Sequence, residues 1–212
     1  MEEEKYYILT NYRIPEKCID QYEKDIKINK LLGKGKFGSV FEVCKEDYDC
    51  NYVLKIVPII KFTDYKTEIK YTVIASKIEI GPKIYSSWMC DNVSTLDKKE
   101  MKMGFILMER MYYTLAMYIS KYRELFIKNS KLLKEMYKEL LTKMLKAKII
   151  NDDLHFNNIM INTNEKLDPI KMRIIDWGMG KSTDDGKYDI DELLDDWDVK
   201  AKLLLEEDSY QN

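Results

Sequence analysis

A glycine-rich turn between two strand-like segments constrains this chain more than any other feature of its sequence. Residues 28–32 lead into the turn, which reads Gly33-x-Gly35-x-x-Gly38, and residues 39–44 alternate in the manner of a β-strand. Glycines let a backbone approach phosphate oxygens closely, because no Cβ intervenes. No Gly-Lys-Ser/Thr follows, so the turn is not a Walker A loop, and the next element is a strand rather than a helix, which argues against a dinucleotide-binding fold. A plain hairpin that contains three glycines explains the pattern equally well.

A lysine stands in the middle of an otherwise apolar strand. Residues 52–57 are rich in Val, Leu and Ile, and Lys55 lies among them. Burying an ammonium group without a partner is costly, so Lys55 needs a carboxylate or a phosphate nearby. Glu68 is the best placed carboxylate, on a helix that we expect Thr63 or Asp64 to cap. The alternative is an edge strand from which the lysine side chain extends into solvent.

Two apolar runs are followed by acids or amides that suit chemistry with a metal ion. Asp153 and Asn158 lie on one loop, as a base that accepts a hydroxyl proton and an oxygen ligand of Mg²⁺. Asp176 follows an apolar run at the end of an expected buried strand, a position that suits a hard cation. The alternatives are a turn rich in Asp and Asn for the first pair, and a helix cap or turn for Asp176.

The remaining pattern predicts two more strands and then a mainly helical half. The strands are expected at residues 83–89 and 104–108, with a polar loop at 91–102 between them. The helices are expected at residues 115–122, 130–148 (capped by Ser130) and 188–205. Five strands with one inserted helix, followed by helices, make an α+β arrangement with a cleft near residues 109–111.

Composition limits the class of protein. The 212 residues are 45% hydrophobic and 12% aromatic, enough for the core of one domain or of a compact two-lobed domain. The formal net charge of −2 gives no reason to expect nucleic-acid binding, which usually shows as a strong basic excess. No apolar run approaches the ~18 residues that span a bilayer, and the acidic start has no secretory signal. We therefore expect a soluble, cytoplasmic protein without membrane or nucleic-acid partners.

The cysteines favour the same compartment. The four cysteines are scattered along the chain, and none forms a Cys-x-x-Cys pair: Cys18, Cys44, Cys50 and Cys90. With His155 as the only histidine, a structural zinc site is not expected. Scattered cysteines in a chain of this length do not resemble a disulfide framework, so we expect unpaired cysteines in a reducing compartment.

In this order, the motifs together resemble the protein-kinase-like superfamily. They are Leu-Gly-Lys-Gly-Lys-Phe-Gly-Ser-Val at 32–40, Val-Leu-Lys at 53–55, Glu68, Met-Glu-Arg-Met at 108–111, Asp-Leu-His-x-x-Asn at 153–158 and Asp-Trp-Gly at 176–178. The likeness covers residues 28–180 and implies a bilobal fold, with a five-stranded antiparallel N-lobe sheet, one N-lobe helix, and a truncated, mainly helical C-lobe. The implied domains are a leader at 1–27 (with a short strand or apolar strap at 6–9), an N-lobe at 28–108, a hinge at 109–111 and a minimal C-lobe at 112–212.

The resemblance implies that the chain uses ATP and Mg²⁺ and transfers a phosphoryl group to a hydroxyl. The three glycines, with Phe37 at the tip of their turn, would cover the ATP phosphates, and Lys55, held by Glu68, would bind the α- and β-phosphates. Asp153 would orient and deprotonate the acceptor hydroxyl. The adenine would contact four side chains and two backbone groups: the side chains of Val40, Val53, Met108 and Met160, and the backbone of Glu109 and Met111. The Mg²⁺ ligands would be Asn158 and Asp176.

The chain departs from the family at three places near these residues. Asn151-Asp152-Asp153 replaces the usual His-Arg-Asp, whose arginine reads a phosphate on the activation loop, so we expect no activation by such phosphorylation. His155 stands where Ser/Thr kinases usually carry a lysine, and both a structural contact and a phosphate or acceptor contact remain open. Trp177 replaces the usual Phe and keeps a large apolar anchor.

The fourth departure is length. Only 34 residues follow Gly178, with no Ala-Pro-Glu triplet, so the peptide-docking half of the C-lobe is expected to be minimal. The helix at 188–205 could pack under the catalytic loop, anchored by Asp189 or Asp191. The chain is then similar to small viral kinases and to the kinase of the KEOPS complex, and its wealth of Lys, Ile, Asn and Tyr suits a large DNA virus and a place in the host cytoplasm.

Three functions stay open. The first is a minimal serine/threonine protein kinase with a protein substrate, and a protein partner could complete its C-lobe. The second is a pseudokinase-like binding module, and the third is a small-molecule kinase.

Overall fold

The computed structural model describes residues 6–22, 26–35, 38–45, 49–60, 62–97, 99–184 and 188–207. The chain forms two compact units. The first comprises Met1–Ile69 and Lys83–Arg110, and the second comprises Lys70–Pro82 and Met111–Asn212. One division falls within helix α2 (Phe62–Lys77), and another falls between Arg110 and Met111.

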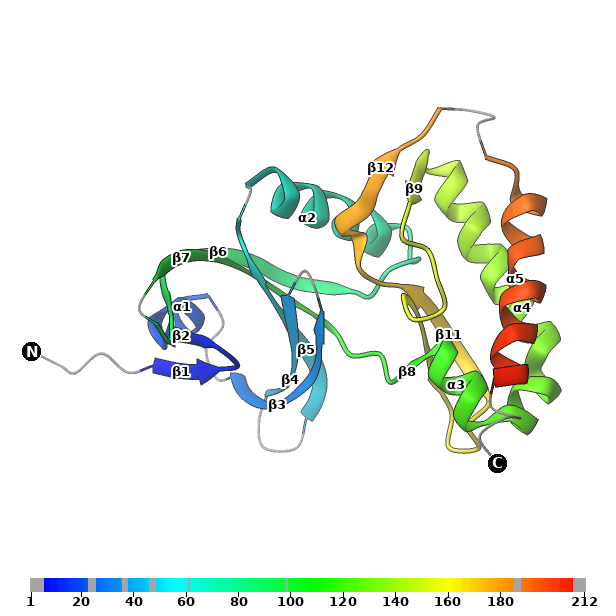
Figure 1. Ribbon diagram of the computed structural model, residues 1–212, viewed down its shortest axis with the longest axis horizontal. Coiled ribbons are helices and arrows are strands. Elements are labelled where there is room, and N and C mark those ends of the chain that lie inside the picture. The colour runs from blue at the N-terminus through cyan, green and yellow to red at the C-terminus, as the bar shows by residue number, and fades with distance from the viewer. Residues whose placement is uncertain are drawn as a thin grey trace, which may run out of the picture. The chain divides into compact units, whose positions relative to one another are not determined.

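The first unit is built on a seven-stranded antiparallel sheet with the order β1-β2-β6-β7-β5-β4-β3 (Figure 1). Its strands are β1 (Tyr6–Leu9), β2 (Tyr12–Pro15), β3 (Ile26–Gly35), β4 (Gly38–Lys45), β5 (Asp49–Pro58), β6 (Ile84–Thr95) and β7 (Glu100–Glu109). A one-turn helix, α1 (Lys17–Asp20), follows β2.

The five expected strands are present as β3 to β7, and residues 6–15 add two strands to the sheet that the expected count did not include. Of the two interpretations of residues 6–9, the short strand is the one observed, and β1 pairs with β2 as a hairpin. This hairpin joins the sheet because β6 extends as far as Thr95, and its end pairs with β2, with Tyr12 opposite Thr95.

The polar loop expected at residues 91–102 is also wrong, because both flanking strands extend into it. Val93 and Met103 are fully buried in the core, while Asp91, Glu100 and Lys102 are exposed. The segment has the alternation of a half-buried strand, which its many charged residues conceal.

The two faces of this sheet carry different apolar clusters. Phe105 and Leu107 belong to the larger cluster, which includes Trp88 and Phe41, whereas Ile106 and Met108 belong to the other. Successive side chains of a strand point to opposite faces, so neighbouring residues of β7 separate in this way. On β5, Val53 lies with Met108 and Leu54 lies with Phe105, so Lys55 shares the face of Val53 and Met108.

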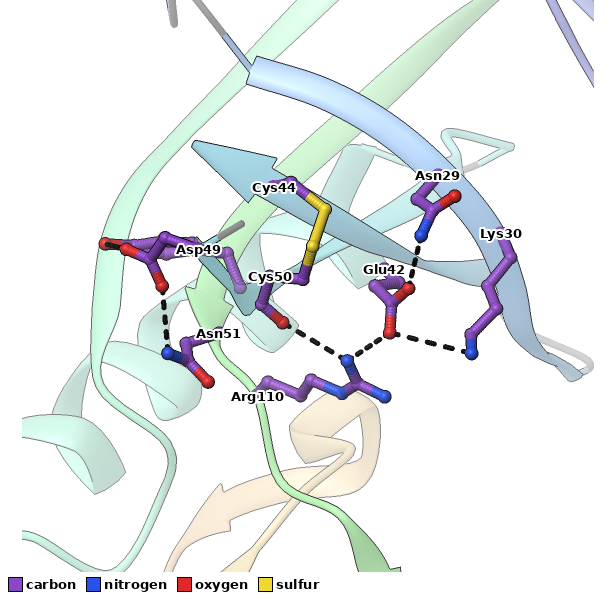
Figure 2. Close-up of a disulfide and its surroundings, with 9 residues drawn as sticks. Asn29, Lys30, Glu42, Cys44, Asp49, Cys50, Asn51 and Arg110 are labelled. Carbon is purple, nitrogen blue, oxygen red and sulfur yellow. Dashed lines mark hydrogen bonds and ion pairs between the residues drawn. A yellow bond between two sulfur atoms is a disulfide. The ribbon is translucent and has the colours of Figure 1, made fainter. Parts of the chain in front are cut away.

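The four cysteines form two disulfides, so the expectation of unpaired cysteines is wrong. Cys18 of α1 is bonded to Cys90 of β6, with Cα atoms 5.7 Å apart, because α1 packs against β6. Cys44 and Cys50 join the end of β4 to the start of β5 (Figure 2). The spacing of the cysteines in the sequence does not reveal the Cys18–Cys90 pair, because these residues are 72 positions apart and only the folded sheet brings them together.

The second unit combines helices with two small sheets. Its helices after α2 are α3 (Leu115–Lys121), α4 (Arg123–Lys146) and α5 (Ile190–Glu207). Its sheets have the orders β11-β10-β8 and β12-β9. The strands are β8 (Tyr113–Thr114), β9 (Ile149–Asn151), β10 (Ile159–Thr163), β11 (Pro169–Ile174) and β12 (Gly180–Ser182). None of the helices in the described part of the chain combines the length and apolar composition needed to cross a membrane.

Helix α4 begins earlier than expected. Ser130 does not cap it, because its hydroxyl donates to the carbonyl of Ile127 from inside the helix at 2.9 Å. The expected apolar stripe is present, and Leu133, Leu140 and Met144 are buried. Figure 1 shows α5 beside α4, and the ring of Trp197 on α5 contacts those of Tyr137 and Phe156, at centroid distances of 4.9 and 5.0 Å.

Candidate active site

The glycine-rich turn joins β3 to β4, with Gly35 opposite Gly38. Residues 36 and 37, including Phe37, lie outside the described residues. Gly38 has φ +153°, and a Cβ there would lie 2.3 Å from the carbonyl oxygen of Ile56, so only glycine fits. A Cβ on Gly33 or Gly35 would meet no described atom within 4 Å. The backbone at those two positions is therefore open to approach by a ligand.

Lys55 and Glu68 form a buried ion pair, with Nζ and Oε1 2.5 Å apart. Lys55 is 8% exposed and Glu68 4% exposed. The alternative of a lysine that extends from an edge strand is excluded, because β5 lies between β7 and β4. Removing one partner of such a pair leaves an uncompensated buried charge and typically costs about 3–5 kcal/mol.

The residues expected around adenine divide between the two units. In the first unit, Val53 lies opposite Met108 on neighbouring strands, and both pack with Val40. The N–H of Glu109 donates to the carbonyl of Lys83 at 2.8 Å, so the adenine-binding role expected of Glu109 is restricted to its carbonyl. In the second unit, the two expected residues are Met111, which is buried, and Met160, which lies on β10.

Arg110, next to Glu109, is bound to two strands (Figure 2). Its Nη1 donates to the carbonyl of Cys50 at 3.2 Å and forms an ion pair with Glu42, a buried acid on β4. Glu42 also accepts a 2.6 Å hydrogen bond from Asn29, and Lys30 Nζ lies 3.8 Å away. Sequence reasoning missed Glu42, although an acid within an apolar strand needs a partner for the same reason that Lys55 does.

The loop between β9 and β10 brings Asp153 and Asn158 together. The side-chain amide of Asn158 donates to Oδ2 and to the backbone carbonyl of Asp153, both at 3.0 Å. The backbone N–H of Asn158 donates to the backbone carbonyl of His155 at 2.8 Å, and the backbone carbonyl of Asn158 accepts from the N–H of Ile175 at 2.8 Å. Asn158 therefore orients the candidate base and also holds the backbone just before Asp176.

Asn151 contacts the backbone of both candidate acids, although in the sequence it stood out only as a departure from the family. It is 2% exposed, and its amide donates to the backbone carbonyl of Asp176 at 2.9 Å. Its Oδ1 accepts the N–H of Asp153 at 3.0 Å. The available signal was a polar side chain that ends a buried strand two residues before the candidate base.

Asp176 adopts a left-handed backbone conformation, with φ +56° and ψ +73°. Such a conformation is uncommon for a residue other than glycine and persists where its surroundings fix it. Asn151 holds the carbonyl of Asp176, and the buried indole of Trp177 donates to Ile174 at 3.1 Å. Trp177 thus provides the apolar anchor that was expected of it.

Two further side-chain contacts lie at or next to the candidate base. Asp152 forms an ion pair with Lys181 on β12, and the hydrogen bond from Lys181 to Asp152 raises the pKa of the lysine. His155 Nε2 lies 3.5 Å from Asp153 Oδ1, while His155 Nδ1 is buried and has no hydrogen-bond partner among the described residues.

Asp189, one expected anchor of α5, accepts the N–H of Asp191 at 2.9 Å and so caps its own helix.

The donor set of the second unit fits Mg²⁺. The amide nitrogen of Asn158 is committed to Asp153, which leaves its oxygen as one candidate ligand, and the carboxylate of Asp176 is the other. The described residues contain no cluster of three or more His, Cys, Asp or Glu side chains that could hold a metal ion. Mg²⁺ suits such a sparse site, because it is usually bound by one or two carboxylates with phosphates and water.

Residues 26–196 match the family model described as the protein kinase domain. The match covers most of the chain and continues into α5, and the chain therefore belongs to the protein kinase domain family. Phosphoryl transfer is the general activity of this family. The resemblance found in the sequence is confirmed, together with a mixed α+β fold.

Proposed function

We propose that this chain is an ATP- and Mg²⁺-dependent protein kinase that phosphorylates serine or threonine. The observation that carries the proposal is the buried Lys55–Glu68 ion pair at 2.5 Å. Lys55 extends from the sheet face that also carries Val40, Val53 and Met108. An ammonium fixed in this way supplies a positioned positive charge for a polyphosphate.

Each candidate residue then has a separate task. The backbone of Gly33 and Gly35 covers the phosphates, and Lys55 holds the α- and β-phosphates. The proposed adenine contacts are Val40, Val53 and Met108 from the first unit and Met160 from the second, and the proposed hydrogen bonds to the adenine edge use the Glu109 carbonyl and the Met111 N–H. Bound Mg²⁺ would neutralise charge on the phosphates, held by Asn158 and Asp176. Asp153 accepts the proton of the acceptor hydroxyl.

The Asp152–Lys181 pair supports a catalytic loop that needs no phosphate on the activation segment. Strand β12, which carries Lys181, pairs with β9 directly before the candidate base, with Gly180 opposite Asn151. The ion pair joins the same two segments without any added group.

A small-molecule kinase is the second candidate, favoured by His155. Its imidazole lies 3.5 Å from the candidate base, where Ser/Thr kinases carry a longer lysine. A pseudokinase-like binding module is less well supported, since the lysine–glutamate pair and the Asp153–Asn158 bond are both intact.

We further propose that a protein partner binds to an exposed apolar part of α5. Val199 and Leu203 lie one turn apart on α5, and each is more than half exposed.

The two disulfides favour an oxidising environment over the expected cytoplasm, because disulfides rarely persist in reducing compartments.

A transfer assay tests the proposed activity. The purified chain is incubated with γ-labelled ATP and Mg²⁺, first with generic protein substrates and then with a panel of small hydroxyl compounds. We expect label on serine or threonine, lost in Asp153→Asn and Asp176→Ala and retained in Asp97→Asn, whose exposed carboxylate lies in the turn between β6 and β7. Label only in small compounds would support the second candidate, and ATP binding without transfer to any acceptor would contradict both.

A further inference from the structure

The ring of Tyr65 on α2 lies directly against the backbone of β7 at Gly104. A Cβ on Gly104 would lie 2.1 Å from Cε2 and 2.5 Å from Cζ of this ring, so no other residue fits beside it. Tyr65 is buried, and its hydroxyl donates to the carbonyl of Trp88 at 2.9 Å. A glycine within a strand often marks such a close approach.

The contact lies on the same sheet face as the candidate phosphate-binding lysine. Ile106 is opposite Lys55 on the neighbouring strand, and Gly104, two residues before Ile106, faces the same way. Tyr65 packs with Ile106 and Val57 in the apolar cluster of this face. The ring therefore fills the space between α2 and the sheet beside Lys55.

Tyr65 and Glu68 are three residues apart on α2, so they lie on one face of the helix. The depth to which the Tyr65 ring enters therefore sets how closely Glu68 approaches the sheet. Ordinary carbon contacts are about 3.5–4.0 Å, so a methyl group on Gly104 must push the ring away by more than ~1 Å. A shift of that size would take Glu68 Oε1 and Lys55 Nζ, now 2.5 Å apart, out of hydrogen-bond range.

We propose that Tyr65 and Gly104 are positioning residues that set the Lys55–Glu68 ion pair, and with it the affinity for the phosphates of ATP. This inference rests on the proposed function. Burial raises the pKa of Tyr65 to about 12, so its hydroxyl remains a hydrogen-bond donor at physiological pH. The contact acts through Glu68 and does not itself touch the nucleotide.

The test compares ATP with adenosine, which has no phosphates for Lys55 to bind. We expect Gly104→Ala to weaken ATP binding by roughly tenfold, the loss that ~1.4 kcal/mol produces, and to leave adenosine affinity within about twofold. Tyr65→Phe keeps the ring in place and should bind ATP nearly as the natural chain does. Tyr137→Ala, which removes a buried ring from the core of the second unit, is the control for general loss of stability.

A double-mutant cycle separates this contact from other effects of the methyl group. Once Tyr65→Ala has removed the ring, adding Gly104→Ala should cause no further loss of ATP affinity. Equal weakening of ATP and adenosine by Gly104→Ala, or full additivity in the cycle, would overturn the proposal.

Labelling of Lys55 with an amine-reactive reagent, read by mass spectrometry, provides a test that needs no nucleotide. The ion pair protects Lys55, so Gly104→Ala should increase its labelling in the folded chain, whereas Tyr137→Ala should not. If the natural chain binds no ATP, the proposed function fails, while the labelling comparison still decides the positioning role. Unchanged labelling in Gly104→Ala would refute that role.

Discussion

Asn151 connects the candidate base to the candidate metal ligand: its amide donates a 2.9 Å hydrogen bond to the carbonyl of Asp176, and its Oδ1 accepts the N–H of Asp153 at 3.0 Å. A single carboxamide therefore fixes the backbone at both acids. Because Asp176 has a left-handed conformation, its position depends on such outside support.

Replacing Asn151 should impair turnover more than nucleotide binding. Asn151→Ala removes both bonds, each worth about 1–3 kcal/mol when a buried partner is left unsatisfied, and we expect kcat to fall by roughly 10- to 100-fold. Asn151→His, the residue usual in the family, should recover part of the loss. Steady-state kinetics check this, with Asn129→Ala, which loses an amide bond to Asp168, as the matched control. A normal kcat for Asn151→Ala would show that the link is dispensable.

Glu42 should matter chiefly for stability. Glu42→Ala leaves Arg110 without its buried carboxylate partner, and we expect the free energy of unfolding to fall by about 3 kcal/mol. Urea denaturation measures the loss. The double variant Glu42→Ala/Arg110→Ala should be less unstable than the two single losses added together, and strict additivity would speak against a direct pair.

The stability of the chain should decrease in alkali through Tyr65. Its pKa is raised to about 12 in the folded chain from 10.0, so the neutral form is favoured by folding. This contribution is fully present below pH 10 and is lost as the pH rises through 12; between pH 9 and pH 11 the loss is about 1.4 kcal/mol. The free energy of unfolding, measured by urea denaturation at several pH values in this range, should fall less steeply with pH for Tyr65→Phe than for the natural chain. Identical slopes would contradict the shift.

The cysteines should be unreactive in the natural chain. After denaturation without reductant, a maleimide reagent should label none of Cys18, Cys44, Cys50 or Cys90, and after reduction it should label all four. Mass spectrometry gives the count directly. Complete labelling before reduction, in protein purified without reductant, would restore the expectation of unpaired thiols.

Activity should not depend on phosphorylation of the activation segment. Phosphatase treatment is expected to leave kcat unchanged, because Lys181 already pairs with Asp152. Lys181→Ala should lower kcat by less than about fivefold, since ion pairs this exposed are weak. A strong loss after phosphatase treatment would mean that a phosphate is needed after all.

The sequence is informative where a buried charge must find a partner. Lys55 and Glu68 could be paired in advance, because an ammonium in an apolar strand has few stable alternatives, and the structure brings them together. The Asp153–Asn158 contact follows from their short separation on one loop. Their roles in catalysis remain predictions.

Contacts between distant segments could not be predicted in this way. The Tyr65–Gly104 contact depends on how deeply a helix sits on a sheet, and neither residue type signals it alone. The Cys18–Cys90 bond depends on α1 packing against β6. The sequence did not predict α1, and the strand that it predicted here ended one residue before Cys90. The end of β6 and the start of β7 contain many charged residues, so their sequence resembles a polar loop even though buried and exposed positions alternate in it.

The rings of Trp197 and Phe156, tilted by 57° with centroids 5.0 Å apart, connect α5 to the loop that carries the candidate base. A proteolytic cut or premature stop ahead of Trp197 would spare every candidate catalytic residue, yet it would remove the ring that packs against Phe156 of that loop. Loss of activity after such a truncation would therefore not reveal a substrate-binding role for α5. Limited proteolysis of this protein should be interpreted with that support in mind.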